Sequence, residues 1–256
     1  MTKTSYVLEG IQGAPVLVVA NSVAADYTMW DLQIAEWRKH FQVLRYSYRG
    51  HGATPANGNK ATSKDLADDI ISLVDQLGIK EFHWAGLSLG GMLGLYMAAH
   101  YPSRVKSLVA ACFRPYQTEE TAGQWAQRIV MVEDKGMEPL VSPTAERWLT
   151  EAFRKARPDQ DQAIRHMIAT TSVPGYQAVG HVVKDYDARP YMDKVVCPVQ
   201  LIAGLQDGGA PFAEVESLTK ILKNAQYVAL PAAHIANIEC APEFTKIVVD
   251  FIHKQA

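Results

Sequence analysis

Short apolar runs alternate with amphipathic stretches along most of this chain. In the segment 63–77 the apolar residues fall on one helical stripe, and Ser63 and Asp65 suit a helix start. Several other runs are continuously apolar, as in strands buried on both faces. We expect strands at 15–20, 41–48, 82–87, 105–112, 199–204 and 226–230, and helices at 63–77, 88–101 and 242–253. This alternation predicts an α/β fold with a mostly parallel central sheet and helices on both faces.

The interval between residues 113 and 198 breaks this alternation. It is rich in helix-forming residues and holds three amphipathic stretches, at 121–135, 144–155 and 159–169. An insertion at this point of such a sheet would lie over the carboxyl ends of the strands. We therefore expect a core made of 1–113 and 198–256, with a helical cap at 114–197 inserted before the last two strands. Such a cap would shape a pocket and limit the access of water.

Composition narrows the choice of function. The chain of 256 residues has 27 acidic and 25 basic residues and a net charge of −2, so no basic face for nucleic acid is expected. No apolar run approaches the roughly 20 residues of a membrane helix, and no secretory signal is visible. Three cysteines without pairing or zinc-like spacing favour a reducing, cytoplasmic location and give no support to a metal site. The oligomeric state is left open.

The most informative motif is Gly86-Leu87-Ser88-Leu89-Gly90. A strand-like run precedes it and a helix-like run follows, which is the context of a nucleophile elbow. The turn is sharp enough to require small flanking residues, and it exposes the serine oxygen at the edge of the sheet. We therefore predict that Ser88 is a nucleophile and that the backbone N–H of Leu89 helps to bind an oxyanion.

A serine nucleophile needs a base and an acid that orients the base. In this architecture the chain order is serine, acid, histidine. His234 lies in the loop between the last predicted strand and the last helix, and Asp207 follows the strand at 199–204. Asp193 is the alternative acid, although it precedes that strand. His51 lies in a turn after the strand at 41–48 and is interpreted as structural, although it could border the site.

Several stretches of the chain resemble a known family along nearly its whole length. They include 13–22, 29–31, 43–46, 49–52, 86–92, 146–148, 152–154, 175–176, 201–204 and 232–239. The sequence resembles the α/β-hydrolase superfamily and, more narrowly, the 3-oxoadipate enol-lactonases. The pair Asn21-Ser22 discriminates best, because most relatives have His-Gly at that point. The chain departs from the usual pattern at Val23-Ala24, at Ser47, which stands where the family has aspartate, and in the segment 111–116.

This resemblance implies a serine hydrolase of the β-ketoadipate pathway of aromatic catabolism. Such an enzyme opens 3-oxoadipate enol-lactone to 3-oxoadipate through an acyl-enzyme, with a small molecule as its partner and without a cofactor. It also implies a second oxyanion donor, the N–H of Val23. The residues expected to contact substrate are Ser22, Trp125, Arg128 and Trp148, with Arg128 as the candidate for the substrate carboxylate.

Three other functions fit parts of the same pattern. A carboxylesterase or lactonase for another small acyl substrate would share every catalytic residue. A cofactor-free oxygenase or a C–C hydrolase on this fold is disfavoured by the Ser-Asp-His set together with Asn21-Ser22. A non-catalytic ligand receptor would be indicated by a broken triad, and the triad is intact.

Overall fold

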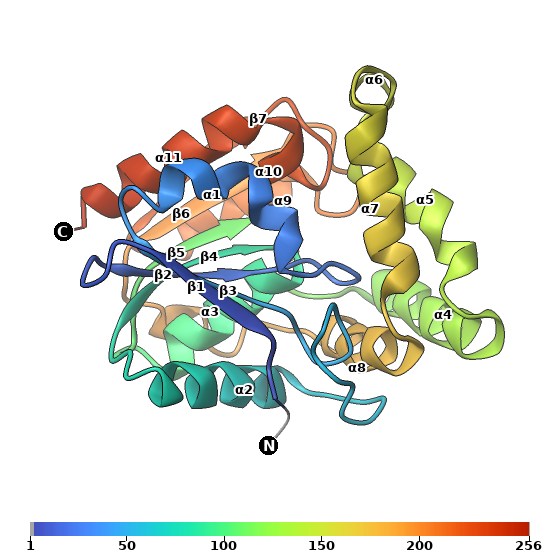
Figure 1. The fold of residues 1–256 in the computed structure, drawn as a ribbon, viewed down its shortest axis with the longest axis horizontal. Helices are drawn as coiled ribbons and strands as arrows, with labels where there is room; N and C mark the ends of the chain where they lie inside the picture. The colour runs from blue at the N-terminus through green and yellow to red at the C-terminus, as the bar shows by residue number, and fades with distance from the viewer. Residues whose placement is uncertain (1–2, 256) are drawn as a thin grey trace.

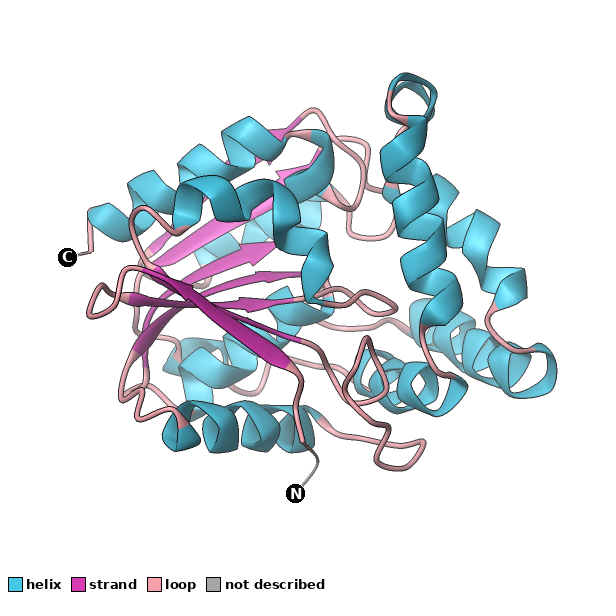
Figure 2. Cartoon of the chain, viewed as in Figure 1, coloured by secondary structure: helices cyan, strands magenta, loops and turns pink. Residues whose placement is uncertain are grey.

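The computed structural model describes residues 3–255 of the chain. Within these residues, seven strands form one sheet in the order β1-β3-β2-β4-β5-β6-β7. The strands are β1 (Tyr6–Gly10), β2 (Val16–Ala20), β3 (Gln42–Tyr46), β4 (Phe82–Leu87), β5 (Val105–Ala111), β6 (Val199–Gly204) and β7 (Ala225–Leu230). Every neighbouring pair is parallel except β1 and β3. The predicted sheet is confirmed, and the antiparallel edge strand β1 adds to it (Figure 2).

Helices cover both faces of the sheet. One face carries α1 (Asp31–Trp37), α10 (Ala236–Glu239) and α11 (Ala241–His253), and the other carries α2 (Ser63–Gln76) and α3 (Leu89–His100) (Figure 1). The remaining short elements are η1 (Tyr27–Trp30), η2 (Met192–Lys194), α9 (Phe212–Ser217) and η3 (Leu218–Lys220). The start of α2 is capped by Thr62 and Asp65 in a reciprocal capping box, so the cap lies one residue before the predicted start. No helix in the described residues has the length and apolar character of a membrane span.

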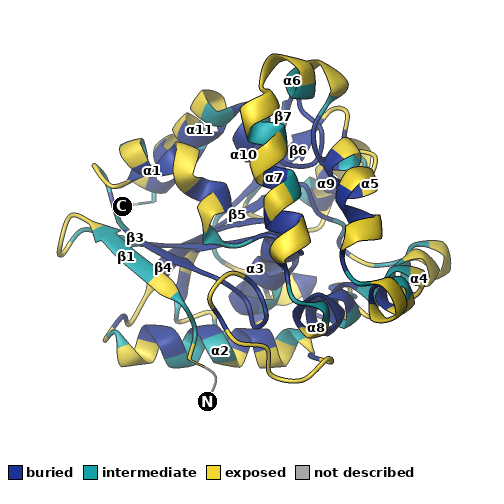
Figure 3. Ribbon diagram, turned by 45° about the vertical axis from the view of Figure 1, so that its right-hand side comes forward, coloured by how far each residue is buried: buried dark blue, intermediate teal, exposed yellow. Residues whose placement is uncertain are grey.

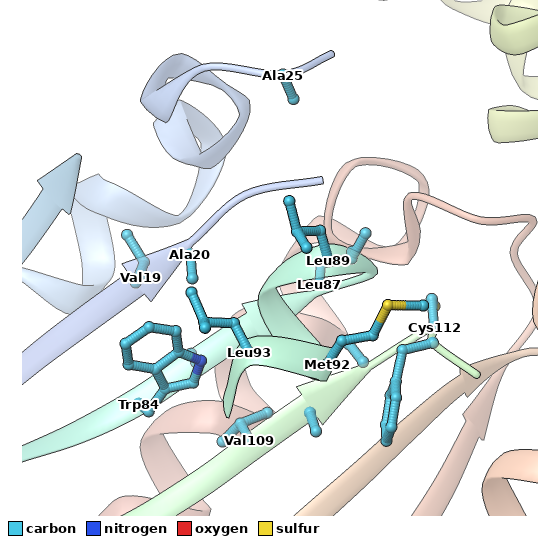
Figure 4. Close-up of a cluster of buried hydrophobic side chains, with 14 of the residues drawn as sticks. Val19, Ala20, Ala25, Trp84, Leu87, Leu89, Met92, Leu93, Val109 and Cys112 are labelled. Carbon is cyan, nitrogen blue, oxygen red and sulfur yellow. The ribbon is translucent and has the colours of Figure 1, made fainter. Parts of the chain in front are cut away.

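The core lies on both sides of the central strands. Every residue of β4 and β6 is buried, as the continuous apolar runs predicted (Figure 3). Leu89, Met92 and Leu93 of α3 lie among buried side chains that include Trp84 of β4 and Cys112 at the end of β5 (Figure 4). Helix α3 is buried nearly all round, because the sheet covers one side and other elements cover the rest.

The long interval between β5 and β6 folds into helices that lie beyond one end of the sheet (Figure 1). These cap helices are α4 (Glu119–Lys135), α5 (Glu138–Trp148), α6 (Glu151–Ala156), α7 (Pro158–Thr170) and α8 (Val173–Lys184). Helices α4 to α7 account for the three predicted amphipathic stretches. Helix α8 was not predicted; it packs along α4 and is largely buried.

Two sets of hydrogen bonds attach the cap helices to the core. At the start of α8, the N–H and the hydroxyl of Ser172 both donate to the carbonyl of Gly50, over 3.1 and 2.9 Å. At the junction of α5 and α6, the N–H and the hydroxyl of Thr150 donate to the carboxylate of Glu239, over 2.8 and 2.6 Å. These contacts tie the cap to the loop at Gly50 and to helix α10 rather than to the sheet itself.

A buried histidine inside the sheet should make stability depend on pH. The His83 ring on β4 lies 2.7 Å from the Ser107 hydroxyl on β5, and burial lowers the pKa of His83 from 6.5 to about 4. Between these two values the unfolded chain binds a proton that the folded chain does not. The free energy of unfolding should therefore fall as the pH falls through this window, and this effect should end below about pH 4.

The variant His83→Asn tests this expectation, because asparagine keeps a polar partner for Ser107 and does not titrate. Denaturant unfolding followed from pH 7 to pH 4 should give wild type a steeper pH dependence than the variant, by up to ~1.4 kcal/mol per pH unit. Equal slopes for the two proteins would mean that folding does not lower the pKa of His83, and would contradict this expectation.

Candidate active site

Ser88 occupies the turn that joins β4 to α3. Its backbone has φ of +58° and ψ of −116°, a conformation rare for a residue with a side chain. A Cβ atom on Gly86 would lie 2.1 Å from the carbonyl oxygen of Gly90, and one on Gly90 would lie 2.1 Å from that of Ala20. Only glycine fits at either position, so the turn has the strained geometry that a nucleophile elbow requires.

His234 and Asp207 form a direct pair. The Nδ1 atom of His234 lies 2.8 Å from Oδ2 of Asp207, whose side chain is completely buried. The other carboxylate oxygen accepts the N–H groups of Gly209 and Ala210, over 2.7 and 3.0 Å. These bonds satisfy an ionised carboxylate on both oxygens and fix the histidine ring. Asp193, the alternative acid, lies in η2 and forms no such contact among the described residues.

Backbone hydrogen bonds hold together the two loops that carry Asp207 and His234. After β6 and β7 end, Leu205 and Gln206 still donate to the carbonyls of Leu230 and Ala232, over 2.9 Å each. Arg114, which follows β5, donates from Nε to the carbonyl of Gly209 over 2.8 Å and forms an ion pair with Glu214. The turn after Asp207 is therefore held from two sides, and sequence reasoning quoted Arg114 only as part of an atypical segment.

Ser88 and His234 line the same cavity, which has a volume of about 350 Å³. The described residues form no hydrogen bond between the Ser88 hydroxyl and the His234 ring. Catalytic contacts of this kind are often long in unliganded enzymes and tighten when substrate binds. The arrangement provides a serine, a histidine and a buried aspartate in the order that acyl transfer needs.

The two predicted oxyanion donors come from the loop after β2 and from the start of α3. Val23 lines the cavity, and Leu89 supplies the first N–H of α3. Among residues 3–255 neither N–H donates to a backbone carbonyl, which leaves both available to a ligand. The N–H of Gly90 donates to the backbone carbonyl of Asn21 over 3.0 Å. This bond holds the loop that carries Val23 against the start of α3.

His51 contacts the loop that carries Val23 and Ala24. Its Nε2 atom accepts the N–H of Ala24 over 3.1 Å, and its Nδ1 atom contacts the carbonyl of Arg49 over 3.0 Å. Burial lowers the pKa of His51 to about 4, which keeps the ring neutral and able to accept. Ala24 has φ of +59°, so the loop takes an uncommon conformation next to Val23. The structural interpretation of His51 agrees with these contacts, and the turn borders the oxyanion loop.

The four residues predicted to contact substrate all line the cavity: Ser22, Trp125, Arg128 and Trp148. The hydroxyl of Ser22 is buried and has no hydrogen-bond partner among the described residues. The Trp148 ring lies 6.2 Å from the His234 ring, centroid to centroid, and its carbonyl accepts the N–H of Ile235 over 3.1 Å. Trp148 thus packs against the base as well as the cavity.

Asn21 and Ser47 are buried and do not line the cavity. The Asn21 side chain donates to the carbonyl of Tyr46 and accepts from the Trp30 indole, over 2.8 and 2.9 Å, so it joins three core elements. Ser47 is buried beneath the loop, where its hydroxyl accepts the N–H of Tyr27 over 3.2 Å. Of the three sequence departures, Val23-Ala24 and part of the segment 111–116 (Cys112, Phe113 and Arg114) line the cavity, whereas Ser47 does not.

Positive charge gathers on the cap side of the cavity. Arg128 lies over the Trp125 ring, with its guanidinium carbon 5.0 Å from the ring centroid. Arg147 of α5 also lines the cavity, and burial together with the nearby Arg128 lowers the pKa of Arg147 to about 10. Sequence reasoning quoted Arg147 only as part of a family-like stretch. In the described part of the chain, no group of His, Cys, Asp and Glu side chains could hold a metal ion.

Comparison with known proteins defines the class. Residues 15–241 match the model of the alpha/beta hydrolase fold family, and the chain therefore belongs to the α/β-hydrolase family. Within it, the chain is 30% identical to 3-oxoadipate enol-lactonase 2 of Acinetobacter baylyi, over 95% of this chain and 91% of that protein. It is also 28% identical to 3-oxoadipate enol-lactonase 1 of the same organism, over 97% and 92%.

Solved structures agree with this placement. The crystal structure of the enol-lactonase from Burkholderia xenovorans LB400 superposes with a TM-score of 0.95 at 33% identity, covering 98% of this chain and 97% of that one. A thermophilic esterase from Thermogutta terrifontis shares the fold, with a TM-score of 0.93 at 24% identity, over 99% and 94% of the two chains. Family and relatives together support a hydrolase that acts on a lactone or an ester.

The elbow glycines give a direct test of the site's backbone. Gly90→Ala should destabilise the protein by ~1–3 kcal/mol or more, because its methyl group would overlap the Ala20 carbonyl. Gly123→Ala is the matched control, since it adds the same atom inside α4 where nothing lies within 4 Å. That change should stabilise the protein by ~0.5–1 kcal/mol. Urea unfolding of both variants measures the difference, and equal effects would contradict the close backbone contact.

Proposed function

We propose that the protein is a serine hydrolase that opens a small enol-lactone bearing a carboxylate, converting 3-oxoadipate enol-lactone to 3-oxoadipate. One observation carries this proposal. A single cavity is lined by Ser88, by His234 with its partner Asp207 behind it, by the Val23 loop, and by the guanidinium groups of Arg128 and Arg147, which form no ion pair among the described residues. The first set suits acyl transfer, and the second suits an anionic group away from the reacting bond.

The first half of the reaction forms an acyl-enzyme. The Asp207 contact holds Nδ1–H of His234, so that Nε2 is the atom that takes the proton of Ser88 as its oxygen attacks the lactone carbonyl. The N–H groups of Val23 and Leu89 bind the oxyanion of the tetrahedral intermediate; removing one such donor typically costs ~10²–10³ in turnover. The intermediate collapses when the ring C–O bond breaks. The departing enolate takes the proton from His234.

The second half releases the acid. The enol ketonises to the 3-oxo form, and His234 removes a proton from water as the water oxygen attacks the acyl carbon. The ester bond to Ser88 then breaks, and Ser88 recovers its proton from His234. The products balance as lactone plus water giving one 3-oxo dicarboxylic acid, and each step uses only this chain's residues and water.

The relatives support this substrate, because enol-lactonases are similar to the chain over nearly their whole length. The principal alternative is a carboxylesterase or lactonase acting on a different small acyl group. The observation that favours it is the departure at Val23-Ala24, since these two residues line the cavity. Aromatic catabolism through the β-ketoadipate pathway and a cytoplasmic location belong to the enol-lactonase proposal.

Variants of the three catalytic residues test the mechanism. Ser88→Ala should abolish hydrolysis without unfolding the protein, because it removes the nucleophile and little packing. Asp207→Asn should lower kcat by up to ~10⁴, as the equivalent change does in a serine protease, because it leaves His234 in the wrong tautomer. Steady-state assays with circular dichroism as the folding control measure both. Substantial turnover by folded Ser88→Ala would contradict the elbow assignment.

The substrate class is tested with wild-type enzyme. Rates should be compared on an enol-lactone with a remote carboxylate, on its methyl ester, on saturated lactones and on aryl esters. We expect kcat/KM for the acid to exceed that for the methyl ester by ~10–150-fold, the range of a charge-assisted hydrogen bond to a carboxylate. Equal rates on acid and ester, with good activity on aryl esters, would favour the general esterase.

A further inference from the structure

Within the described residues, the arginines that line the cavity differ sharply in their partners. Arg114 is neutralised by Glu214, which accepts from it over 2.8 and 3.0 Å, and it also bonds the carbonyl of Gly209. Arg128 stacks on Trp125 and has no carboxylate partner. Arg147 forms no hydrogen bond and no ion pair among the described residues. The cavity therefore contains one satisfied guanidinium and two without a counterion.

The position of Arg147 brings it next to the catalytic residues. It precedes Trp148 at the end of α5, and a Cβ atom placed on Gly209 would lie 3.8 Å from Arg147 Cδ and 3.6 Å from His234 Nδ1. The side chain thus passes beside the turn that follows Asp207. Arg128 belongs to a different helix, α4, and its ring partner Trp125 neighbours the buried Tyr176 at 6.2 Å.

Among residues 3–255, no carboxylate forms an ion pair with Arg147. Asp207 is fully used by His234 and two backbone N–H groups. Glu120, which also lines the cavity, is exposed and accepts from Gln124 over 3.3 Å. An unpaired, partly buried guanidinium is costly, because it loses hydration without gaining a counterion. The lowered pKa of Arg147 expresses the same cost.

We propose that Arg147 is the principal anchor for the remote carboxylate of the substrate, and that Arg128 contributes a weaker, long-range attraction. The planar fork of a guanidinium matches a carboxylate in a two-point contact. A bound carboxylate supplies the counterion that Arg147 lacks among the described residues. This inference rests on the proposed function, since it names the residue that selects an anionic lactone over a neutral one.

The kinetic test compares acid and methyl ester for four variants. Arg147→Gln should lower the ratio of kcat/KM on the acid to kcat/KM on the ester by ~10–150-fold, with the loss mainly in KM. Arg147→Lys keeps a charge and should recover part of that ratio. Arg128→Gln should change the ratio much less. Arg165→Gln is the control, because Arg165 pairs with Asp161 on α7 and does not line the cavity; it should leave the ratio unchanged.

A binding test separates this inference from the proposed function. Adipate, a saturated six-carbon dicarboxylate, should bind the Ser88→Ala protein in a calorimetric titration, and monomethyl adipate should bind more weakly. Adding Arg147→Gln should weaken adipate binding by ~10-fold or more. This measurement needs no turnover, so it reports on the anion site even if wild type opens no enol-lactone.

The outcomes differ for the two proposals. Absence of lactone hydrolysis by wild type, with Arg147-dependent adipate binding, would overturn the enol-lactone substrate and keep the carboxylate site. Equal losses on acid and ester in Arg147→Gln would show that the residue acts on the fold or on the triad, and would overturn the inference. A larger change of the ratio in Arg128→Gln than in Arg147→Gln would transfer the anchor to Arg128 and would also overturn it.

Discussion

The site depends on one backbone contact, the approach of Gly90 to the end of β2. Because Gly90 has no side chain, the start of α3 lies against the Ala20 carbonyl, and its N–H bonds Asn21 oxygen over 3.0 Å. The elbow at Ser88 and the loop that holds Val23 are therefore fixed by the same contact. The two N–H groups proposed to stabilise the oxyanion come from segments far apart in the sequence. The packing of Gly90 against β2 brings these two segments together.

The cap gives the cavity its chemical character. The core supplies groups that many hydrolases share, whereas α4 and α5 supply Trp125, Arg128, Arg147 and Trp148. A cavity of about 350 Å³ with two uncompensated positive charges suits a small anion better than a long acyl chain. In the proposed enzyme, the core therefore provides the reactive groups and the cap helices provide substrate selectivity. This division agrees with a fold that hosts many acyl-transfer reactions.

Sequence reasoning succeeded where local pattern decides the structure. The buried parallel strands are continuously apolar, and the Gly-x-Ser-x-Gly elbow has its own local geometry, so both could be predicted. β1 escaped notice because it is a half-buried edge strand of mixed character, and α8 because Pro174, Gly175 and Gly180 are poor helix formers that packing against α4 overrides.

The residues that were missed have contacts that no spacing reveals. Arg114 bonds the carbonyl of Gly209 from 95 positions away, and even for His51, which was interpreted as structural, the bond from the Ala24 N–H 27 positions away could not be predicted. Arg147 resembles any arginine on a helix until the fold shows that it forms no ion pair among the described residues. The importance of such residues lies in tertiary partners, present or lacking, so it appears only when the chain is assembled.

Glu239 has a mechanical role. Its carboxylate accepts the N–H of Ala233, beside the base, and both donors of Thr150, where α5 ends and α6 begins. A movement of this end of the cap away from the core would break both Thr150 bonds and the bond from the Ile235 N–H to the carbonyl of Trp148, next to His234. Opening of the cap at this end would therefore disturb the loop that carries His234, so Glu239 couples the position of the cap to the geometry of the site.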